Sequence, residues 1–222
     1  MSVYTAVPER PNGACLVVLQ EIFGVNANVR SITEEFAGHG FWAVAPDLFW
    51  RQQPDVQLDP TSEADREQAS ALMKGLDVDQ AVADAGAALE FAQSQTMGSG
   101  ATMAVGYCLG GKLAFLMAAR GLVATAVSYY GVGIQAVLDE AAAIRGRILL
   151  HIAQEDHLCP PVAQQAIIAA MAPLGKRAQT LSYPGVGHAF ARRGGAGFDR
   201  DKAKQADRAT LEFLETDLGL AK

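Results

Sequence analysis

The chain carries the stretch Gly106-Tyr107-Cys108-Leu109-Gly110-Gly111 between two apolar runs. The run before it, residues 101–105, is short and apolar like a buried strand, and the run after it, residues 112–119, is typical of a buried helix. The sequence therefore predicts a strand, a sharp turn and a helix, with Cys108 at the turn. A thiol in that position is presented as a nucleophile.

Glycines flank Cys108 because the strand and helix backbones must approach closely in so tight a turn. A Cβ atom at Gly106 or Gly110 is expected to collide with the neighbouring backbone. The turn also puts the thiol at the N-terminus of a helix, where exposed N–H groups favour a thiolate. Taken alone, the stretch leaves one alternative open, a glycine-rich turn that carries a buried and inert cysteine.

The composition limits the kind of protein. With 222 residues, 50% of them hydrophobic, the chain suits one α/β domain spanning residues 1–222. A net charge of −6 without a basic stripe argues against nucleic acid as a partner. Three cysteines, Cys15, Cys108 and Cys159, make a disulfide framework or a Cys-rich metal site an unfavourable reading.

The compartment is predicted from similar features. The sequence lacks an apolar run of the roughly 18 residues that a membrane-spanning helix needs, and residues 1–10 lack the pattern of a secretory signal. We therefore expect no membrane partner. Free cysteines in an odd number fit a reducing environment, so a cytoplasmic location is predicted.

Short apolar runs alternate with helical patterns along the chain. The strands are expected at residues 14–19, 41–45, 101–105, 124–130, 147–153 and 177–183, and the helices at residues 26–38, 63–74, 78–95, 112–119, 161–171 and 199–218. Strands that alternate with helices in continuous apolar runs predict a mostly parallel central sheet with helices on both faces. The predicted fold class is α/β.

Polar or reactive side chains follow directly after several predicted strands, where sites form in such sheets. They are Glu21, Asp47, Cys108, Tyr130, Asp156 and His188. Three of them occur in the order nucleophile, acid, histidine, namely Cys108, Asp156 and His188, which is the chain order of the α/β-hydrolases. The order, the sharp turn and the strand ends together predict a Cys-His-Asp triad on an α/β-hydrolase fold.

The triad members have distinct expected roles. His188 would accept the thiol proton and later assist the attack of water, while Asp156 would orient the imidazole and stabilise its charged form. Glu155 is the nearest rival for the acidic role, and a turn residue is the structural alternative for Asp156. His151 lies within an apolar strand and is expected to be a hydrogen-bonded core histidine. Asp47, after a proline, is expected to anchor a turn.

Glu21 is an unusual residue for this edge of the sheet. A carboxylate near a thiol raises the thiol pKa unless the carboxylate moves or is neutralised. One interpretation is a structural salt bridge. The other is a switch, in which Glu21 contacts the thiol or an arginine and an anionic substrate changes that arrangement.

Several further segments resemble the dienelactone hydrolase (carboxymethylenebutenolidase) family. They are residues 20–26, 46–48, 66–68, 106–111, 129–133, 154–157 and 187–192, and they extend over nearly the whole chain. The resemblance implies an α/β-hydrolase that needs no cofactor or metal. It also implies a small anionic lactone or ester as the substrate, and a monomer is expected.

The resemblance also implies roles for individual residues. Cys108, His188 and Asp156 would form the triad, and Glu21 would hold the resting thiol neutral and help form the thiolate when substrate arrives. The backbone N–H groups of Ile22 and Leu109 would form the oxyanion hole. Two arginines would hold the substrate carboxylate, for which a guanidinium is well shaped: Arg66 and Arg192.

The implied reaction is the opening of dienelactone, 4-carboxymethylenebut-2-en-4-olide, to maleylacetate through a cysteine acyl-enzyme. By the same resemblance it would belong to bacterial-type catabolism of aromatic and chloroaromatic compounds. Ser70 and Met73 depart from the family pattern, because they stand where pocket aromatics are expected, and this puts the lactone preference in doubt. Arg193 could share the role of Arg192.

Two alternative functions stay open at this point. The first is a broader carboxylesterase or thioesterase with the same triad, favoured if the pocket near Ser70 and Met73 has opened. The second is a non-catalytic small-molecule binding protein on the same fold. The complete set of triad residues and Glu21 weighs against the second alternative.

Overall fold

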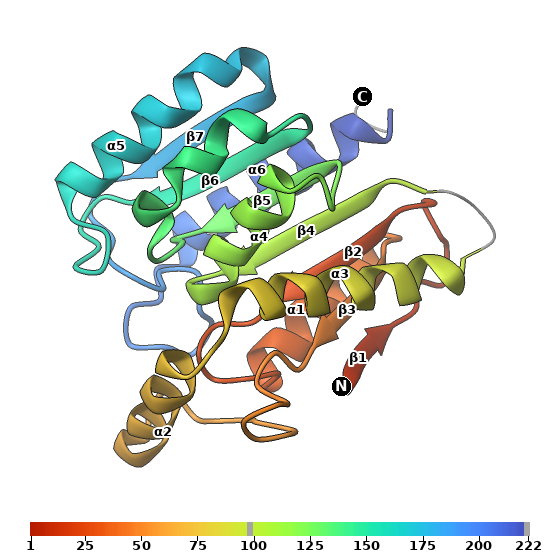
Figure 1. The fold of residues 1–222 in the computed structure, drawn as a ribbon, viewed down its shortest axis with the longest axis horizontal. Helices are drawn as coiled ribbons and strands as arrows, with labels where there is room; N and C mark the ends of the chain where they lie inside the picture. The colour runs from red at the N-terminus through yellow and green to blue at the C-terminus, as the bar shows by residue number, and fades with distance from the viewer. Residues whose placement is uncertain (97–99, 220–222) are drawn as a thin grey trace.

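The computed structural model describes residues 1–96 and 100–219. At its centre lies a sheet of seven strands, which appear in space in the order β1-β3-β2-β4-β5-β6-β7 (Figure 1). Their bounds are β1 Val3–Ala6, β2 Cys15–Leu19, β3 Trp42–Pro46, β4 Thr102–Tyr107, β5 Thr125–Tyr129, β6 Arg147–Ala153 and β7 Ala178–Tyr183.

The neighbouring strands from β3 to β7 pair in parallel, and β1 alone runs antiparallel, against β3. The predicted mostly parallel sheet is therefore confirmed. Strand β1 was not predicted, because its four residues are only half-buried at the edge of the sheet and carry no apolar run. An edge strand has one neighbour and needs a weaker pattern.

Six α-helices in the described residues match the predicted ones within a few positions. They are α1 Ala27–Gly38, α2 Glu63–Lys74, α3 Val78–Ser94, α4 Leu109–Ala119, α5 Pro161–Met171 and α6 Arg200–Asp217. The starts are accurate because short polar side chains cap four of these helices by accepting backbone N–H groups, those of Asn26, Ser62, Asp77 and Asp199. Three short 3₁₀ helices at residues 134–136, 138–143 and 172–177 were not predicted.

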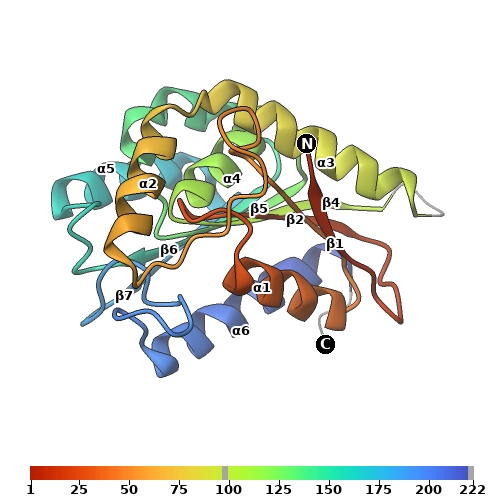
Figure 2. The ribbon, with the colours of Figure 1, turned by 90° about the horizontal axis from the view of Figure 1, so that it is seen from below.

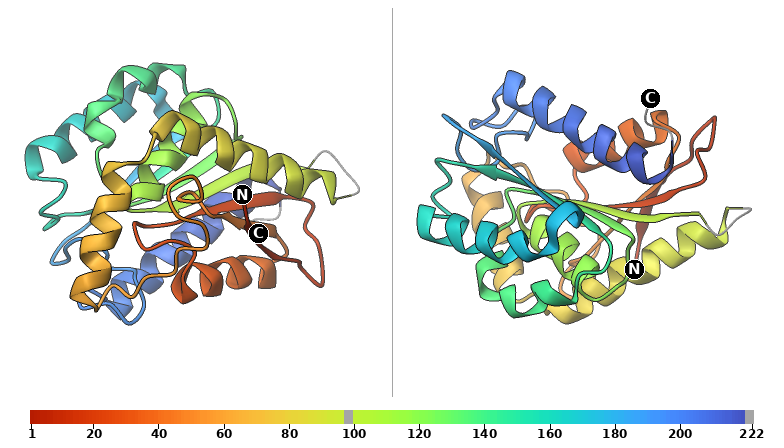
Figure 3. Two further views of the ribbon diagram at one scale, coloured as in Figure 1. Left: turned by 60° about the horizontal axis from the view of Figure 1, so that its bottom comes forward. Right: turned by 90° about the horizontal axis from the view of Figure 1, so that it is seen from above.

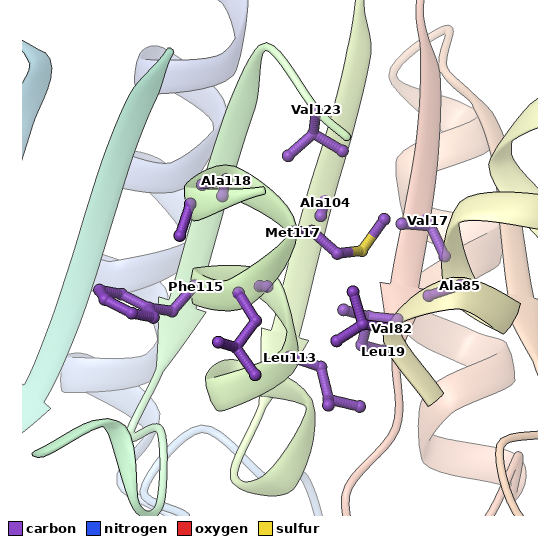
Figure 4. Packing of buried hydrophobic residues seen from close by; sticks show 14 of the residues in the cluster. Val17, Leu19, Val82, Ala85, Ala104, Leu113, Phe115, Met117, Ala118 and Val123 are labelled. Carbon is purple, nitrogen blue, oxygen red and sulfur yellow. The ribbon is translucent and has the colours of Figure 1, made fainter. Parts of the chain in front are cut away.

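The helices cover both faces of the sheet. Helices α1 and α6 lie on one face, and α3, α4 and α5 lie on the other (Figures 2 and 3). Successive residues of a strand point to opposite faces, so Leu16 packs in the core beneath α1 and α6 while Val17 packs in the core beneath α3 and α4. Figure 4 shows Val17 beside Met117 of α4.

Burial of these apolar side chains stabilises the fold, at about 1.5–3 kcal/mol for each large one that is fully buried. The parallel arrangement also brings the carboxyl ends of β2, β4, β5, β6 and β7 to one edge. The residues that follow these ends are therefore gathered at that edge.

Candidate active site

The turn between β4 and α4 is as tight as the sequence predicts. Cys108 has φ +55° and ψ −113°, a conformation that L-residues rarely adopt. A Cβ built on Gly106 would lie 1.9 Å from the carbonyl oxygen of Gly110, and one built on Gly110 would lie 2.3 Å from that of Leu19. The predicted collisions are confirmed, so glycine is required at both positions.

Backbone hydrogen bonds fix this turn to its neighbours. The N–H of Cys108 donates to the carbonyl of Tyr129 at 3.0 Å, and the N–H of Val132 donates to the carbonyl of Cys108 at 3.1 Å. On the other side, the N–H of Gly110 donates to the carbonyl of Gln20 at 3.0 Å. The nucleophile position is therefore tied to the loops that follow both β5 and β2.

The Cys108 thiol is buried, with 5% of the residue exposed. Burial raises the pKa of this thiol far above its usual range, and the nearby charge of Glu21 raises it further. The N–H of Leu109 and the guanidinium of Arg192 act in the opposite direction without prevailing. The helix N-terminus favours a thiolate as expected, through the N–H of Leu109, but desolvation outweighs this effect and the pKa stays raised.

His188 and Asp156 are joined directly. Nδ1 of His188 lies 2.8 Å from Oδ2 of Asp156, whose side chain is 1% exposed. Oδ1 of the same carboxylate accepts the N–H of Leu158 at 2.8 Å, and this fixes its orientation. Glu155 is exposed and does not compete for the imidazole. The acid expected to orient His188 is thus the one that contacts it.

The second nitrogen of His188 is free to act. A carboxylate on Nδ1 places the ring proton there, so Nε2 of the neutral imidazole is an acceptor. Within residues 1–96 and 100–219, this buried Nε2 has no hydrogen-bond partner. An unpaired basic nitrogen at the carboxyl edge of the sheet is what a general base requires.

Glu21 pairs with an arginine. Nε and Nη2 of Arg192 donate to its two carboxylate oxygens at 2.5 and 3.0 Å. The side chains of Glu21 and Arg192 are 4% and 16% exposed, and the guanidinium also lies over the ring of Phe23 at 5.0 Å. Of the two partners considered for Glu21, thiol or arginine, the arginine holds both oxygens.

Arg66 and Arg193 lie elsewhere. Arg66 is exposed on α2, which extends past the carboxyl ends of the strands (Figure 1), and donates to the carbonyls of Pro60 and Thr61 at 3.1 and 2.8 Å. Arg193 is half-exposed and binds Glu35 of α1 at 2.5 Å. Neither guanidinium donates to Glu21. The shared role of Arg66 and Arg192 on a substrate carboxylate stays a prediction.

Ser70 and Met73, the residues that depart from the family pattern, are exposed on the same helix as Arg66. The hydroxyl of Ser70 donates to the carbonyl of Arg66 at 2.8 Å. Their side chains therefore face solvent, and α2 carries no aromatic residue.

Ile22 and Leu109 are placed on the two segments that flank Cys108. Ile22 follows Glu21 in the turn after β2, and Leu109 is the first residue of α4. The hydrogen bond between Gly110 and Gln20 holds these segments together. Their role as an oxyanion hole remains a prediction.

Two residues near the site are structural, as predicted. His151 is buried in β6, with Nδ1 2.8 Å from the hydroxyl of Tyr183 and Nε2 2.9 Å from that of Thr210. The carboxylate of Asp47 accepts backbone N–H groups from its own turn, including that of Asp55 at 2.7 Å. Both expectations are confirmed.

The described part of the chain holds neither a cluster of metal-binding side chains nor a helix that could span a membrane. Among residues 1–96 and 100–219, no three His, Cys, Asp or Glu side chains are grouped as metal ligands would be. Every helix in these ranges is too short or too polar to cross a bilayer.

Two features were not expected from the sequence, because both depend on segments that are far apart in the chain. These are the ion pair between Arg193 and Glu35 and the unpaired hydroxyl of Tyr130. The sequence indicates Tyr130 as a candidate only through its place at the end of a strand. Its positive φ and its lack of a partner carry no local sequence signal, although the Gly131 that follows it indicates a tight turn.

Comparison with known proteins agrees with this geometry. The sequence model of the dienelactone hydrolase family matches residues 1–218. The chain belongs to the dienelactone hydrolase family. A carboxymethylenebutenolidase from Pseudomonas putida is 39% identical to it over 207 residues, which cover 93% of this chain and 87% of that protein. Carboxymethylenebutenolidase 1 from Cupriavidus pinatubonensis is 37% identical over 211 residues, covering 95% and 89%.

Solved structures show the same fold. A dienelactone hydrolase-like promiscuous phosphotriesterase from metagenomic libraries superposes with a TM-score of 0.74 at 20% identity, with 98% of each chain covered. The α/β-hydrolase fold class predicted from the sequence is confirmed. As a dienelactone hydrolase family member, the protein is a hydrolase of ester bonds, and the alternative of a non-catalytic binding protein is set aside.

Proposed function

We propose that the protein opens the ester ring of dienelactone, an unsaturated lactone that bears a carboxylate, and releases maleylacetate through an acyl-enzyme on Cys108. The observation that carries this proposal is the buried pair in which Arg192 grips both oxygens of Glu21. A guanidinium already arranged for one carboxylate at the nucleophile can accept a second one from a substrate. The names of the relatives support the same substrate class.

Substrate binding would activate the thiol. When the substrate carboxylate takes the place of Glu21 on Arg192, the carboxylate of Glu21 loses its counter-charge and becomes a stronger base. It can then accept the proton of the buried Cys108 thiol, whose pKa burial holds high in the resting enzyme. The thiol would thus stay neutral until an anionic substrate arrives, which protects it from unspecific reactions.

Acylation would follow on the thiolate. The sulfur attacks the lactone carbonyl carbon, and the N–H groups of Ile22 and Leu109 would stabilise the oxyanion that forms. The bond between that carbon and the ring oxygen then breaks, and the ring oxygen leaves as an enolate that takes up the proton that Glu21 accepted from the thiol. The substrate remains attached to Cys108 as a thioester.

Deacylation would use the histidine. Nε2 of His188 takes a proton from water, and the resulting hydroxide attacks the thioester carbonyl. The sulfur leaves and recovers its proton, while Asp156 stabilises the imidazolium that forms during the step. Water and lactone are the only reactants in this scheme, and the hydrolysed product carries one more carboxylate than the substrate.

A broader carboxylesterase or thioesterase activity is the second candidate. Ser70 and Met73 favour it, because they stand where the family pattern has pocket aromatics and both are exposed. Both candidates share the thiol and the triad, and they differ in what the arginine contributes.

Kinetics on two substrates tests the proposal. We expect kcat/KM for the carboxylated lactone to exceed that for neutral p-nitrophenyl acetate by about 100-fold, since charge-assisted hydrogen bonds contribute roughly 1.5–3 kcal/mol. A thioester adduct on Cys108, trapped by acid quench and located by mass spectrometry, would identify the nucleophile. A clear preference for the neutral ester would overturn the lactone assignment in favour of the esterase.

A further inference from the structure

Tyr130 has an unusual backbone conformation for its type. It follows β5 directly and has φ +38°, a conformation in which residues other than glycine are strained. Among the described residues, the non-glycine residues with positive φ are Asp55, Cys108, Tyr130 and Ala189. Cys108 and Ala189 are the nucleophile position and the neighbour of His188, so the strain at Tyr130 belongs to a group that borders the site.

The hydroxyl of Tyr130 is buried and unpaired. The residue is 3% exposed, and within residues 1–96 and 100–219 its hydroxyl oxygen has no hydrogen-bond partner. The adjacent Tyr129 differs, since its hydroxyl lies 2.7 Å from Thr210 Oγ1 and 3.1 Å from Asp207 Oδ1. A buried phenol without a partner costs stability, so a group absent from the resting enzyme is the natural partner for it.

The surroundings of Tyr130 belong to the active site. Its ring meets that of His188 edge-on, with centroids 5.1 Å apart, and that of Phe190 at 5.5 Å. Burial raises the pKa of this phenol, and among charged side chains Glu21 contributes most in the same direction, opposed by Arg192. The phenol therefore stays protonated, as a donor on a ring that packs against His188 and Phe190.

We infer that the Tyr130 hydroxyl donates a hydrogen bond to the carboxylate of the bound substrate once that carboxylate has replaced Glu21 on Arg192. This inference rests on the proposed function. A carboxylate has more acceptor positions than one guanidinium fork fills, and a buried donor on a ring that contacts His188 can satisfy one of them. Tyr130 then provides a third side chain that binds substrate, in addition to those of Arg66 and Arg192. It is supplied by the loop after β5 and is independent of Arg66 on α2.

The kinetic test uses two neighbouring tyrosines. We expect Tyr130→Phe to raise KM for the carboxylated lactone about tenfold, through loss of a hydrogen bond to a charged group, and to affect p-nitrophenyl acetate much less. Tyr129→Phe removes a hydroxyl whose partners lie on α6, so it should lower the melting temperature and leave the lactone KM unchanged. The hydroxyl of Tyr130 has no partner to lose, so Tyr130→Phe should keep or raise the melting temperature.

A second readout does not depend on turnover. Iodoacetate and iodoacetamide alkylate Cys108 with nearly the same size but different charge, and the modified cysteine is identified by peptide mass. The wild type should favour iodoacetate relative to iodoacetamide, and Tyr130→Phe should reduce this ratio several-fold while Tyr129→Phe preserves it. This pair of rates measures the carboxylate site even in an enzyme that does not hydrolyse dienelactone.

The outcomes separate the two claims. If the wild type fails on the lactone but Tyr130→Phe still lowers the alkylation ratio, the proposed function fails and the inference stands. If the wild type hydrolyses the lactone and Tyr130→Phe changes neither its KM nor the ratio, the inference is overturned and the function stands. Equal losses on both substrates together with a lower melting temperature would mean a structural role and would also overturn it.

Discussion

Two histidines of this chain show how differently the same side chain is used. His151 in β6 is 1% exposed, with Nδ1 2.8 Å from Tyr183 and Nε2 2.9 Å from Thr210. His188, after β7, uses one nitrogen on Asp156, and its buried Nε2 is unpaired within the described residues. One imidazole is fully satisfied by the fold, and the other keeps an open basic nitrogen.

The contrast extends to the groups around each ring. The neighbours of His151 form a closed network in which Thr210 also meets the hydroxyl of Tyr129, and this network ties the sheet to α6. The neighbours of His188 include the carboxylate of Asp156 and the ring of Tyr130, whose hydroxyl is unpaired within residues 1–96 and 100–219. Of these two histidines, the fully paired one helps to hold the fold, and the one with an unpaired nitrogen is available for chemistry.

The largest effect should come from the nucleophile. Cys108→Ala removes only the attacking sulfur, so kcat/KM should fall about 10⁴-fold or more while the melting temperature stays near that of the wild type. Cys15→Ala, also buried but within β2, is the matched control and should lower stability without comparable loss of activity. Substantial remaining turnover in Cys108→Ala would contradict the nucleophile assignment.

The same substitution at each histidine tests the comparison directly. His188→Gln should lower kcat/KM about 10³-fold with little change in stability, because it removes a general base. His151→Gln should lower the free energy of unfolding by about 1–3 kcal/mol, because it leaves a buried hydroxyl without its partner, and should change kcat/KM only slightly. Chemical denaturation and steady-state kinetics on both variants measure the two effects. If His151→Gln lost activity and His188→Gln lost stability instead, the assignment of a catalytic role to His188 and a structural role to His151 would be wrong.

The buried ion pair should affect both function and stability. Arg192→Met leaves the Glu21 carboxylate buried without its partner, which should destabilise the protein by about 3–5 kcal/mol and raise KM for the lactone about 100-fold. Adding Glu21→Gln removes the stranded charge, so the double variant should recover most of the stability but not the KM. If stability does not recover, the destabilisation has another origin.

The pH dependence of stability provides a smaller and separate test. Burial lowers the pKa of His151 from 6.5 to about 3, so the folded protein holds this ring neutral over that range. The unfolded chain binds a proton below about pH 6.5 and therefore binds more protons than the folded state between these values. The free energy of unfolding should thus fall as the pH drops from 6.5 toward 3, by up to about 1.4 kcal/mol per pH unit.

His151→Gln removes this titration. Urea unfolding at pH 7 and pH 5 should show that the wild type loses about 2 kcal/mol more on acidification than the variant does. Other groups titrate equally in both proteins, so the difference isolates His151. Parallel losses in wild type and variant would mean that the ring is not held neutral.

The sequence was sufficient for features whose cause is local. The apolar runs predicted the core strands and helices within a few residues, and the tight turn around Cys108 explained Gly106 and Gly110, as the contacts of the two glycines confirm. Asp47 and His151 followed from a turn and from an apolar strand, and both interpretations are confirmed.

Other features depend on contacts between distant segments. Whether Glu21 meets the thiol or an arginine is decided by a partner 171 residues away along the chain, which the pattern around Glu21 does not encode. The resting thiol is likewise controlled by burial, a property of the assembled core that outweighs the helix N-terminus. The hydroxyl of Tyr130 has no hydrogen-bond partner among residues 1–96 and 100–219, and this can be recognised only when all its neighbours in space are known.

The smallest effect concerns the loop that carries His188 and Arg192. Arg193 fixes this loop by pairing with Glu35 of α1 at 2.5 Å and lies 3.8 Å from Asp207 of α6. Its side chain is 46% exposed, so solvent screens the pair and Arg193→Ala should cost about 1 kcal/mol or less. Because Arg192 directly precedes Arg193, a looser loop should still raise the KM for the lactone about two- to threefold.

A surface arginine provides the control for that effect. Arg208 pairs with Glu212 on the same face of α6 at 3.9 Å and is 73% exposed, so Arg208→Ala should change neither stability nor KM. If Arg193→Ala behaves like Arg208→Ala, then the loop is positioned by its backbone and the buried pair at Arg192 alone. If Arg193→Ala raises KM selectively for the anionic lactone, then the ion pair between Arg193 and Glu35 helps to position the loop that carries His188 and Arg192. The difference between His188 and His151 would then extend to the residues that hold this loop in place.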